Sequence, residues 1–136
     1  MKIMIVGGTG FLGYHSLLEA LKRGHQADAL AIDDVRLGDW YPTQVKVNYG
    51  DVFELSSDQL QHYFTGYDSM IYAVGPDDRI TPPAPSYEFF RARLVDAVEK
   101  VAIAARKAKV KKMVILNSYF AYFDRIWPEK KLSTRH

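Results

Sequence analysis

Three regularly spaced glycines follow the first apolar run of the chain. Residues 3–6 form a short run, IMIV, of the kind found in buried parallel strands that lie under helices on both faces. The next segment, GGTGFLG, satisfies G-x-x-G-x-x-G through Gly7, Gly10 and Gly13, and it satisfies G-x-G-x-x-G if Gly8 replaces Gly7. Such glycines permit a tight turn and bring backbone N–H groups at a helix start close to phosphate oxygens. The segment therefore predicts a site for the pyrophosphate of a dinucleotide.

Two adjacent acidic residues, Asp33 and Asp34, follow the second apolar run. Asp33 lies 20 residues after Gly13, which is close to the spacing of a carboxylate that binds the ribose of a dinucleotide. Such a carboxylate accepts hydrogen bonds from the ribose hydroxyls, which favours NAD and repels the 2′-phosphate of NADP. Arg36 is also close, and its guanidinium could instead receive that phosphate. The expected cofactor is NAD or NADP, with NAD favoured.

The order of predicted elements indicates the fold class. Strands are expected at residues 3–6, 27–32, 45–49, 69–74 and 112–117, with helices from Phe11 to the turn at Gly24, at 57–64, and after Ser86. This alternation predicts an α/β fold, a doubly wound parallel sheet of the Rossmann type with strand order 3-2-1-4-5. Ser86 is expected to cap the long third helix. The apolar stripe of that helix comprises Phe90, Leu94, Ala97, Val98, Val101, Ala104 and Ala105.

Ligands of doubly wound sheets bind outside the carboxyl ends of the strands. This rule selects five segments: residues 7–13, 33–36, 51–54, 73–79 and 117–122. Trp40 and Tyr41 lie between the second and third predicted strands, and two interpretations stay open for them. They either cover the adenine edge of the ligand or close a loop onto the protein surface.

The composition indicates one domain of an ordinary globular protein. The chain has 136 residues, of which 48% are hydrophobic and 25% charged. It contains no cysteine, which excludes disulfides, thiolate metal sites and cysteine catalysis. The four histidines lack metal-ligand spacing, so no metal site is expected. The net charge of +2 gives no reason to expect a nucleic-acid partner, and the apolar runs are too short for a membrane span or signal peptide. A cytoplasmic location is therefore expected.

Four motifs occur in the order and spacing of a known family. GGTGFLG opens the chain, Gly50-Asp51-Val52 follows the third predicted strand, Ala73-Val74-Gly75 follows the fourth, and ARKAKVKKMVILNS ends at Ser118. Together they resemble the extended short-chain dehydrogenase/reductases, the NAD-dependent epimerase/dehydratase family. The resemblance covers nearly the whole chain and roughly the first half of a family member.

The resemblance assigns roles to individual residues. It implies that Asp51 hydrogen-bonds the adenine amino group, that the backbone of Val52 contacts the adenine ring, and that residues 73–75 line the ribose and nicotinamide side. Ser118 aligns with the catalytic serine that holds a substrate oxygen; Tyr122 also matches that motif, whereas Phe123 replaces its glycine. The expected cofactor-binding residues are Gly7, Thr9, Gly10, Phe11, Leu12, Gly13, Asp33, Asp51, Val52, Ala73, Val74 and Gly75.

The chain departs from the family in its acid–base groups. The family uses a tyrosine in Tyr-x-x-x-Lys, and no tyrosine here is followed by a lysine four residues later. Arg93 and Leu94 stand where the family has an asparagine on the long helix. The sequence therefore predicts one dinucleotide-binding domain over residues 1–136, without the C-terminal substrate domain of the family. The chain is either a fragment of a longer protein, which is the favoured interpretation, or a cofactor-binding remnant.

Two functions stay open on the sequence alone. The first is the NAD(P)-binding domain of an epimerase, dehydratase or reductase that transfers a hydride to or from a nucleotide-sugar-like or other hydroxyl or carbonyl substrate. The alternative is a non-catalytic sensor that uses the same pocket to read the NAD(P) redox state. The expected partners are the dinucleotide and a small-molecule substrate, with a homodimer left open.

Overall fold

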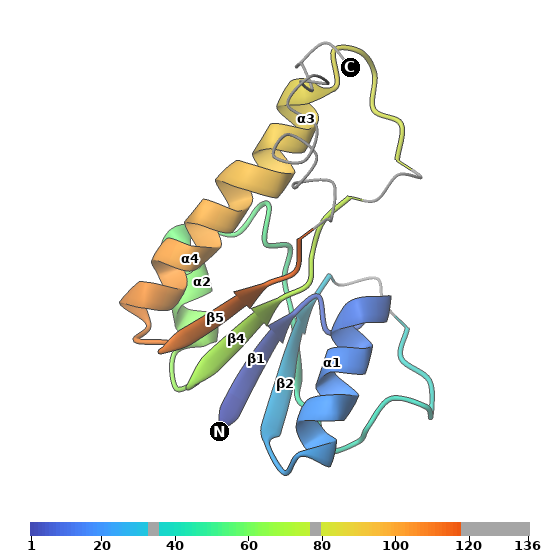
Figure 1. Ribbon diagram of the computed structural model, residues 1–136, viewed down its shortest axis with the longest axis vertical. Coiled ribbons are helices and arrows are strands. Elements are labelled where there is room, and N and C mark those ends of the chain that lie inside the picture. Colours follow the sequence, from blue (N-terminus) through green and yellow to red (C-terminus); the bar gives the residue numbers. More distant parts are fainter. Residues whose placement is uncertain (33–35, 77–79, 118–136) are drawn as a thin grey trace, which may run out of the picture.

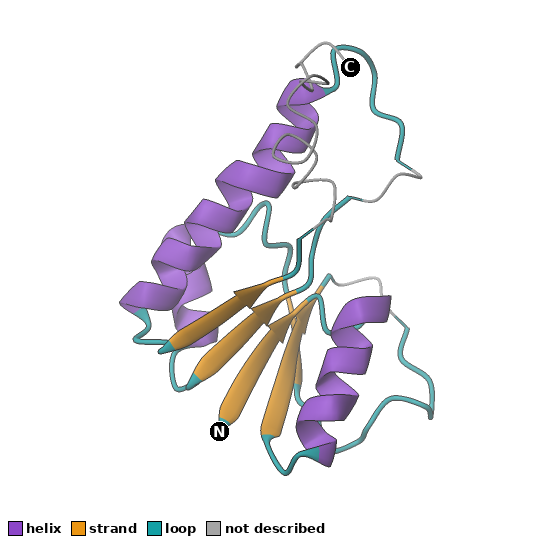
Figure 2. Cartoon of the chain, in the orientation of Figure 1, coloured by secondary structure: helices purple, strands orange, loops and turns teal. Residues whose placement is uncertain are grey.

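The computed structural model describes residues 1–32, 36–76 and 80–117, which form a parallel sheet with helices on both faces (Figure 1; Figure 2). The strands are β1 (Lys2–Val6), β2 (Gln26–Ala31), β3 (Val47–Tyr49), β4 (Ser69–Tyr72) and β5 (Lys112–Ile115). The helices are α1 (Phe11–Lys22), α2 (Ser57–Phe64), α3 (Tyr87–Arg91) and α4 (Ala97–Lys107), with a π-helical turn, η1 (Ala92–Asp96), between the last two. The sheet order is β3-β2-β1-β4-β5 and all neighbours are parallel, so the predicted doubly wound α/β fold is confirmed.

Alternate residues of β1 point to opposite faces of the sheet and lie in two separate cores. Met4 and Val6 face α2 and α4, where they pack with Leu60, Phe64 and Val101. Ile3 and Ile5 face α1, where they pack with Leu17, Ala20 and Tyr41. The described residues thus form three layers, with the sheet in the middle (Figure 2).

Strands β4 and β5 end two residues earlier than the sequence predicts. β4 ends at Tyr72 and β5 ends at Ile115. One further backbone bond follows each ladder, from the Ala73 N–H to the Val6 carbonyl at 2.9 Å and from the Leu116 N–H to the Tyr72 carbonyl at 3.1 Å. The apolar pattern continues past these bonds because the next residues line cavities at the sheet edge instead of pairing with a neighbouring strand.

The long helix differs from its prediction in two respects. Ser86 occupies the N-cap position, but its side chain makes no capping hydrogen bond, so the expected side-chain cap is wrong. The apolar stripe is buried from Ala97 onward, whereas Leu94 is 47% exposed. The π-helical turn changes the register of the stripe, and α3 extends beyond the carboxyl ends of the strands, where no sheet lies beneath it (Figure 1).

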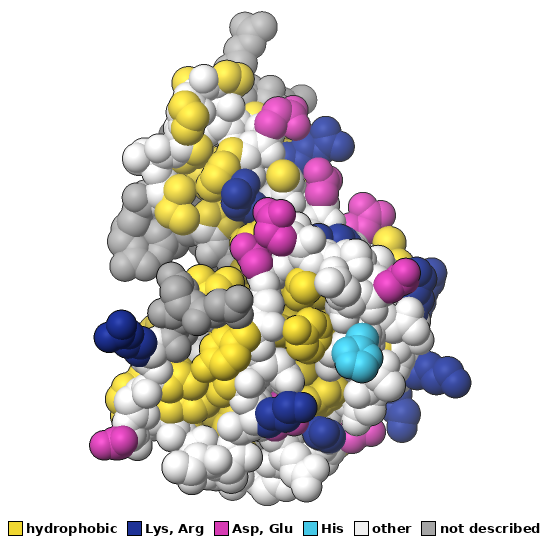
Figure 3. Space-filling view, turned by 180° about the vertical axis from the view of Figure 1, so that it is seen from behind, with side chains coloured by type: hydrophobic (Ala, Val, Ile, Leu, Met, Phe, Trp, Pro, Cys, Tyr) yellow, Lys and Arg dark blue, Asp and Glu magenta, His cyan; other side chains and the backbone are white. Residues whose placement is uncertain are grey.

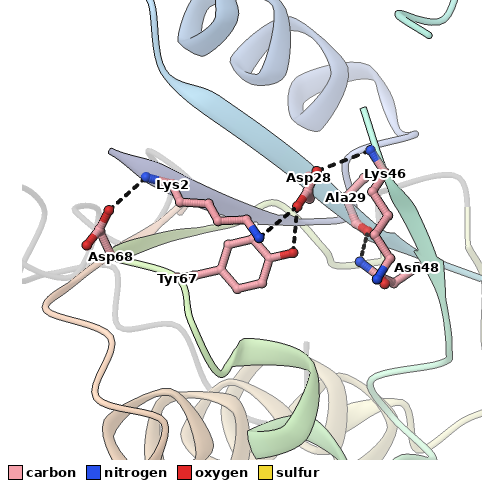
Figure 4. Close-up of polar contacts among 7 residues, drawn as sticks. All are labelled: Lys2, Asp28, Ala29, Lys46, Asn48, Tyr67 and Asp68. Carbon is pink, nitrogen blue, oxygen red and sulfur yellow. Dashed lines mark hydrogen bonds and ion pairs between the residues drawn. The ribbon is translucent and has the colours of Figure 1, made fainter. Parts of the chain in front are cut away.

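A polar cluster joins the strands at the amino end of the sheet (Figure 4). Asp28 accepts hydrogen bonds from the Tyr67 hydroxyl at 2.7 Å and from the Lys46 N–H at 3.1 Å. The Lys2 ammonium lies 3.6 Å from the Asp28 carboxylate, and the Lys2 N–H donates to Asp68 at 2.8 Å. This backbone hydrogen bond lowers the pKa of the Asp68 carboxyl group. The cluster lies at the opposite end of the sheet from the cavities and holds β1 against β2 and the turn before β4.

The surface carries mixed charge on the face seen in Figure 3, where Lys and Arg side chains are interspersed with Asp and Glu. Hydrophobic side chains also gather on this face between the charged ones. Among the described residues, no helix combines the length and apolar character that a membrane crossing requires.

Candidate dinucleotide-binding site

Two cavities open at the carboxyl edge of the sheet. The first has a volume of about 320 Å³ and extends over the ends of β1, β2 and β4. The second has a volume of about 560 Å³ and lies between the ends of β4 and β5 and the side chains of η1 and α4. Both volumes fall within the range of about 300–1,000 Å³ that is usual for small-molecule sites. Residues 73–75 line both cavities, so the end of β4 forms their shared wall.

The first cavity gathers most of the residues selected from the sequence. Eight of them line it: Gly7, Thr9, Gly10, Asp51, Val52, Ala73, Val74 and Gly75. Six further lining residues had been given no binding role, although Phe53 lies in the selected segment 51–54: Val6, Leu30, Ala31, Ile32, Gly50 and Phe53. Phe53 directly follows Asp51 and Val52, and Ala31 and Ile32 directly precede Asp33, so their positions next to the motifs were the available signal.

The remaining predicted residues have other positions. Leu12 lines the second cavity. Phe11 is 77% exposed and is not among the residues that line the described cavities. Gly13 is buried beneath the loop. Asp33 and Ser118 lie outside the described residues.

The glycine loop follows the first of the two spacings. Gly7 has a φ of +83°, and a Cβ atom there would lie 2.7 Å from the Ala73 carbonyl oxygen, so only glycine fits without strain. Gly10 also lines the cavity, and the Gly7 carbonyl oxygen is the one described heavy atom within 4 Å of its Cβ position, at 3.4 Å. These two glycines leave the cavity floor free of side chains.

Gly8 and Gly13 support the loop from below. A Cβ atom on Gly8 would lie 2.7 Å from the Ala29 side chain, because this residue packs between β1 and β2. A Cβ atom on Gly13 would overlap the Gly7 carbonyl group. Gly13 therefore allows α1 to pack directly against the loop. Gly8 packs against β2 and does not line the first cavity.

The first turn of α1 leaves backbone donors unused by the helix itself. Gly10 is the N-cap, and the first intrahelical bond runs from the Tyr14 N–H to the Gly10 carbonyl at 2.8 Å. The N–H groups of Phe11, Leu12 and Gly13 have no acceptor within the helix. Together with the positive end of the helix dipole, they provide donors for an anion.

Tyr41 holds the glycine loop from the α1 side of the sheet. Its hydroxyl donates a hydrogen bond to the Gly8 carbonyl at 3.2 Å, and burial raises the pKa of this tyrosine to about 12. Trp40 packs edge-on against Tyr14, and the Tyr14 hydroxyl donates to the Trp40 carbonyl at 3.1 Å. Trp40 and Tyr41 therefore close their loop onto α1, which agrees with the second of the two interpretations left open by the sequence.

Asp51 organises the turn on the opposite side of the first cavity. Its Oδ1 atom accepts a hydrogen bond from the Phe53 N–H at 2.8 Å. Its backbone carbonyl accepts from the Glu54 N–H at 3.0 Å and from the Leu55 N–H at 2.8 Å. Val52 is only 4% exposed and anchors the turn in the core. This turn, residues 51–55, is called the Asp51 turn below.

Tyr72 places a hydroxyl in the wall beneath both Asp51 and the second cavity. The residue is 1% exposed, and its oxygen has no hydrogen-bond partner among the described residues. Burial raises the pKa of this hydroxyl to about 12, with a further contribution from the Asp51 carboxylate. The phenol is therefore neutral at ordinary pH and its hydrogen-bonding capacity is unused.

The second cavity has a largely apolar wall. Leu94 and Val98 line it from the long helix, and Ile115 and Leu116 line it from the end of β5. The Leu94 side chain approaches Gly75 closely, since a Cβ atom on Gly75 would lie 3.2 Å from it. Leu94 thus places a methyl group at the boundary between the two cavities.

Comparison with known proteins agrees with this arrangement. A family described as NAD(P)H-binding matches residues 7–135. A protein from Burkholderia pseudomallei whose name calls it exported is 28% identical, with a TM-score of 0.57 over 85% of this chain and 47% of its own. The Bordetella bronchiseptica enzyme WbmG, solved with NAD, is 22% identical, with a TM-score of 0.70 over 90% of this chain and 39% of its own.

A third similar structure is the UDP-glucose-4-epimerase of Stenotrophomonas maltophila, solved with NAD and a formylated UDP-arabinopyranose. It is 15% identical, with a TM-score of 0.68 over 90% of this chain and 38% of its own. The chain spans less than half the length of each of these three proteins. The shared fold and the family match confirm the resemblance drawn from the sequence, and this chain belongs to the NAD(P)H-binding family.

Proposed function

We propose that NAD(P) binds across the carboxyl edge of the sheet, with its pyrophosphate on the glycine loop and its adenosine in the first cavity. The observation that carries the proposal is the meeting of two independent motifs at one cavity. The bare loop at Gly7 and Gly10 lies on one side, and the Asp51 turn lies on the other. A dinucleotide needs both features, because the loop supplies donors for phosphate and the turn supplies acceptors for a base.

The proposal assigns a role to each side of the first cavity. The free N–H groups of Phe11, Leu12 and Gly13 would donate to the pyrophosphate. The second carboxylate oxygen of Asp51 would accept from the adenine amino group, while Val52 and Phe53 contact the ring. Asp33, which follows Ile32 at the cavity wall, would bind the ribose hydroxyls and favour NAD over NADP.

We assign the nicotinamide and the substrate to the second cavity. When bound, the cofactor supplies a hydride donor or acceptor. Residues 73–75 would carry the dinucleotide from the first cavity to the second. Asn117 lines the second cavity, so the following Ser118 would hold a substrate oxygen there. The proton transfer is assigned to a group outside these 136 residues, because no tyrosine here precedes a lysine by four positions.

The substrate class rests on the compared enzymes. The epimerase noted above holds a UDP-sugar, and WbmG has also been solved with NAD and UDP. A nucleotide-sugar-like substrate is accordingly our proposal for the whole protein, with other hydroxyl or carbonyl compounds as alternatives. The comparisons do not favour the non-catalytic sensor. The cytoplasmic location and the homodimer stay predictions.

Calorimetric titration of the full chain with NAD, NADH, NADP and NADPH tests the proposal. We expect micromolar or tighter binding, with NAD(H) preferred. The variant Gly10→Ala adds a methyl group to the cavity floor without a clash inside the protein, so binding should weaken at least about tenfold while thermal stability is retained. Ser16→Ala, on the exposed side of α1, is the matched control and should bind normally. Failure of the native chain to bind any of the four dinucleotides overturns the proposal.

A further inference from the structure

The long helix contacts the Asp51 turn through one partly buried lysine. The Lys100 ammonium, on α4, donates hydrogen bonds to the Phe53 carbonyl at 3.0 Å and to the Leu55 carbonyl at 2.8 Å. These partners lie 47 and 45 residues away in the sequence. Hydrogen bonds from an ammonium are charge-assisted and stronger than those between neutral groups.

We propose that Lys100 is a positioning residue for adenine recognition, a role that rests on the proposed function of the first cavity. The hydrogen bonds of the Asp51 turn divide between two residues. Its N–H groups at residues 53–55 donate to Asp51, and its carbonyls at Phe53 and Leu55 accept from Lys100. Residue Phe53 is therefore held through both its N–H and its carbonyl, and its N–H orients the Asp51 carboxylate.

A second contact from the long helix should keep the Asp51 turn in place when the Lys100 ammonium is removed. The Arg93 guanidinium lies 5.4 Å from the centre of the Phe53 ring and 3.9 Å from that of Phe89. This cation–π contact holds the Phe53 ring but does not constrain its carbonyl. Val52 also stays anchored in the core. Removing the Lys100 ammonium should therefore change the orientation of the Asp51 carboxylate while the turn remains in place.

The packing of α4 does not depend on the Lys100 ammonium. The helix is buried through Ala97, Val101, Ala104 and Ala105, which pack against α2 and the sheet. A methionine at position 100 keeps an unbranched side chain of similar length and adds no helix-breaking feature. The variant Lys100→Met should therefore fold, and its effect should be confined to the turn.

The test compares NAD with nicotinamide hypoxanthine dinucleotide, which lacks the adenine amino group. The native chain should bind NAD about tenfold more tightly than the hypoxanthine compound, because Asp51 accepts from the amino group. In Lys100→Met this ratio should fall below about threefold, mainly through weaker NAD binding. A general loss of stability would instead weaken both ligands equally. Lys100→Arg, which retains the charge and the donors, should restore most of the ratio.

Lys107→Met is the matched control. Lys107 lies two turns further along α4, is half exposed, and contacts Asp58 of α2 at 3.9 Å instead of the Asp51 turn. It should keep the native ratio. If Lys100→Met does not fold, Lys100→Gln carries the same prediction. A native ratio in the folded Lys100 variant overturns this inference alone, whereas no NAD binding by the native chain overturns the proposed function itself.

Discussion

The glycine loop and the Asp51 turn border the same cavity but are held in place in different ways. The glycine loop is shaped by close packing that only bare backbone permits, with Gly13 directly beneath the Gly7 carbonyl and Gly7 against the Ala73 carbonyl. The Asp51 turn is held by local hydrogen bonds to Asp51 and, in addition, by the Lys100 ammonium, which comes from a helix more than forty residues away. The first arrangement leaves a pattern of residue types in the sequence, whereas the second leaves none that spacing could reveal.

The two regions also differ in how their buried tyrosine hydroxyls are used. The Tyr41 hydroxyl, beneath the glycine loop, donates to the Gly8 carbonyl. The Tyr72 hydroxyl, near the Asp51 turn, has no partner among the described residues. Two side chains with the same chemistry should therefore have opposite effects on stability when the hydroxyl is removed.

The largest effect is expected for Gly13→Val, which tests the packing of the glycine loop. The new side chain would overlap the Gly7 carbonyl and force α1 away from the loop. The free energy of unfolding should fall by about 3 kcal/mol, the upper part of the range for overpacked sites, and NAD binding should be lost. Urea denaturation and calorimetry measure the two effects. A native-like unfolding midpoint would show that the helix does not pack on the loop as described. Gly10→Ala, which should weaken binding but keep stability, is the control.

The next largest effect is a loss of stability at alkaline pH, to which both regions contribute. In the unfolded chain the tyrosines ionise near pH 10, whereas the pKa values of Tyr41 and Tyr72 are about 12 in the folded protein. Below pH 10 both tyrosines are neutral in both states, and as the pH rises from 10 to 12 the unfolded chain ionises first, so the folded state loses stability. At pH 11 the loss should be about 1 kcal/mol for each tyrosine. Urea midpoints at pH 9, 10 and 11 measure it, and a double variant with phenylalanine at both positions should show a smaller decline.

A smaller effect is expected for Tyr41→Phe. The Gly8 carbonyl loses its buried donor, which should lower the free energy of unfolding by about 1 kcal/mol and weaken NAD binding a few-fold. The control is Tyr63→Phe, which removes an exposed hydroxyl that donates to the Tyr49 carbonyl at 2.9 Å. Equal stability losses in the two variants, with unchanged NAD affinity in both, would remove the special role of Tyr41.

The smallest effect, and the one of opposite sign, is expected for Tyr72→Phe. Its buried hydroxyl has no described partner, so its removal should raise the free energy of unfolding by up to about 1 kcal/mol. The measurement is again urea denaturation at neutral pH. A clear loss of stability would mean that the hydroxyl does form a hydrogen bond, and the contrast with Tyr41 would then disappear.

The fold class could be predicted because each of its determinants is local. Apolar runs of strand length alternate with helical patterns, and right-handed crossovers then leave few possible strand orders. The strand ends were less predictable, because Ala73, Val74 and Leu116 continue the apolar runs of the strands they follow. The sequence predicted the N-cap position of the long helix correctly but not the absence of a capping bond, since serine is compatible with that position whether or not its side chain forms the bond.

The motifs of the candidate site could be predicted from the sequence, whereas the side-chain contacts that hold its loops in place could not. Gly7, Gly10, Asp51 and residues 73–75 were selected from their types and from their positions at strand ends, and the structure brings them to one cavity. The choice between Gly7 and Gly8 needed the structure, because both satisfy a glycine spacing and only a backbone dihedral angle distinguishes them. Tyr41 was not assigned to the glycine loop, because its contact with the Gly8 carbonyl depends on the approach of a segment 33 residues away.

Residue types and short spacings along this chain were enough to establish a parallel sheet and a loop of bare backbone after its first strand. Both follow from steric limits that act within a few neighbouring residues. The folded chain alone decided that an ammonium on α4 contacts the Asp51 turn and that Leu94 packs against Gly75 at the wall shared by two cavities. Such contacts join residues far apart in sequence, and their formation depends on the angle and register at which whole elements pack.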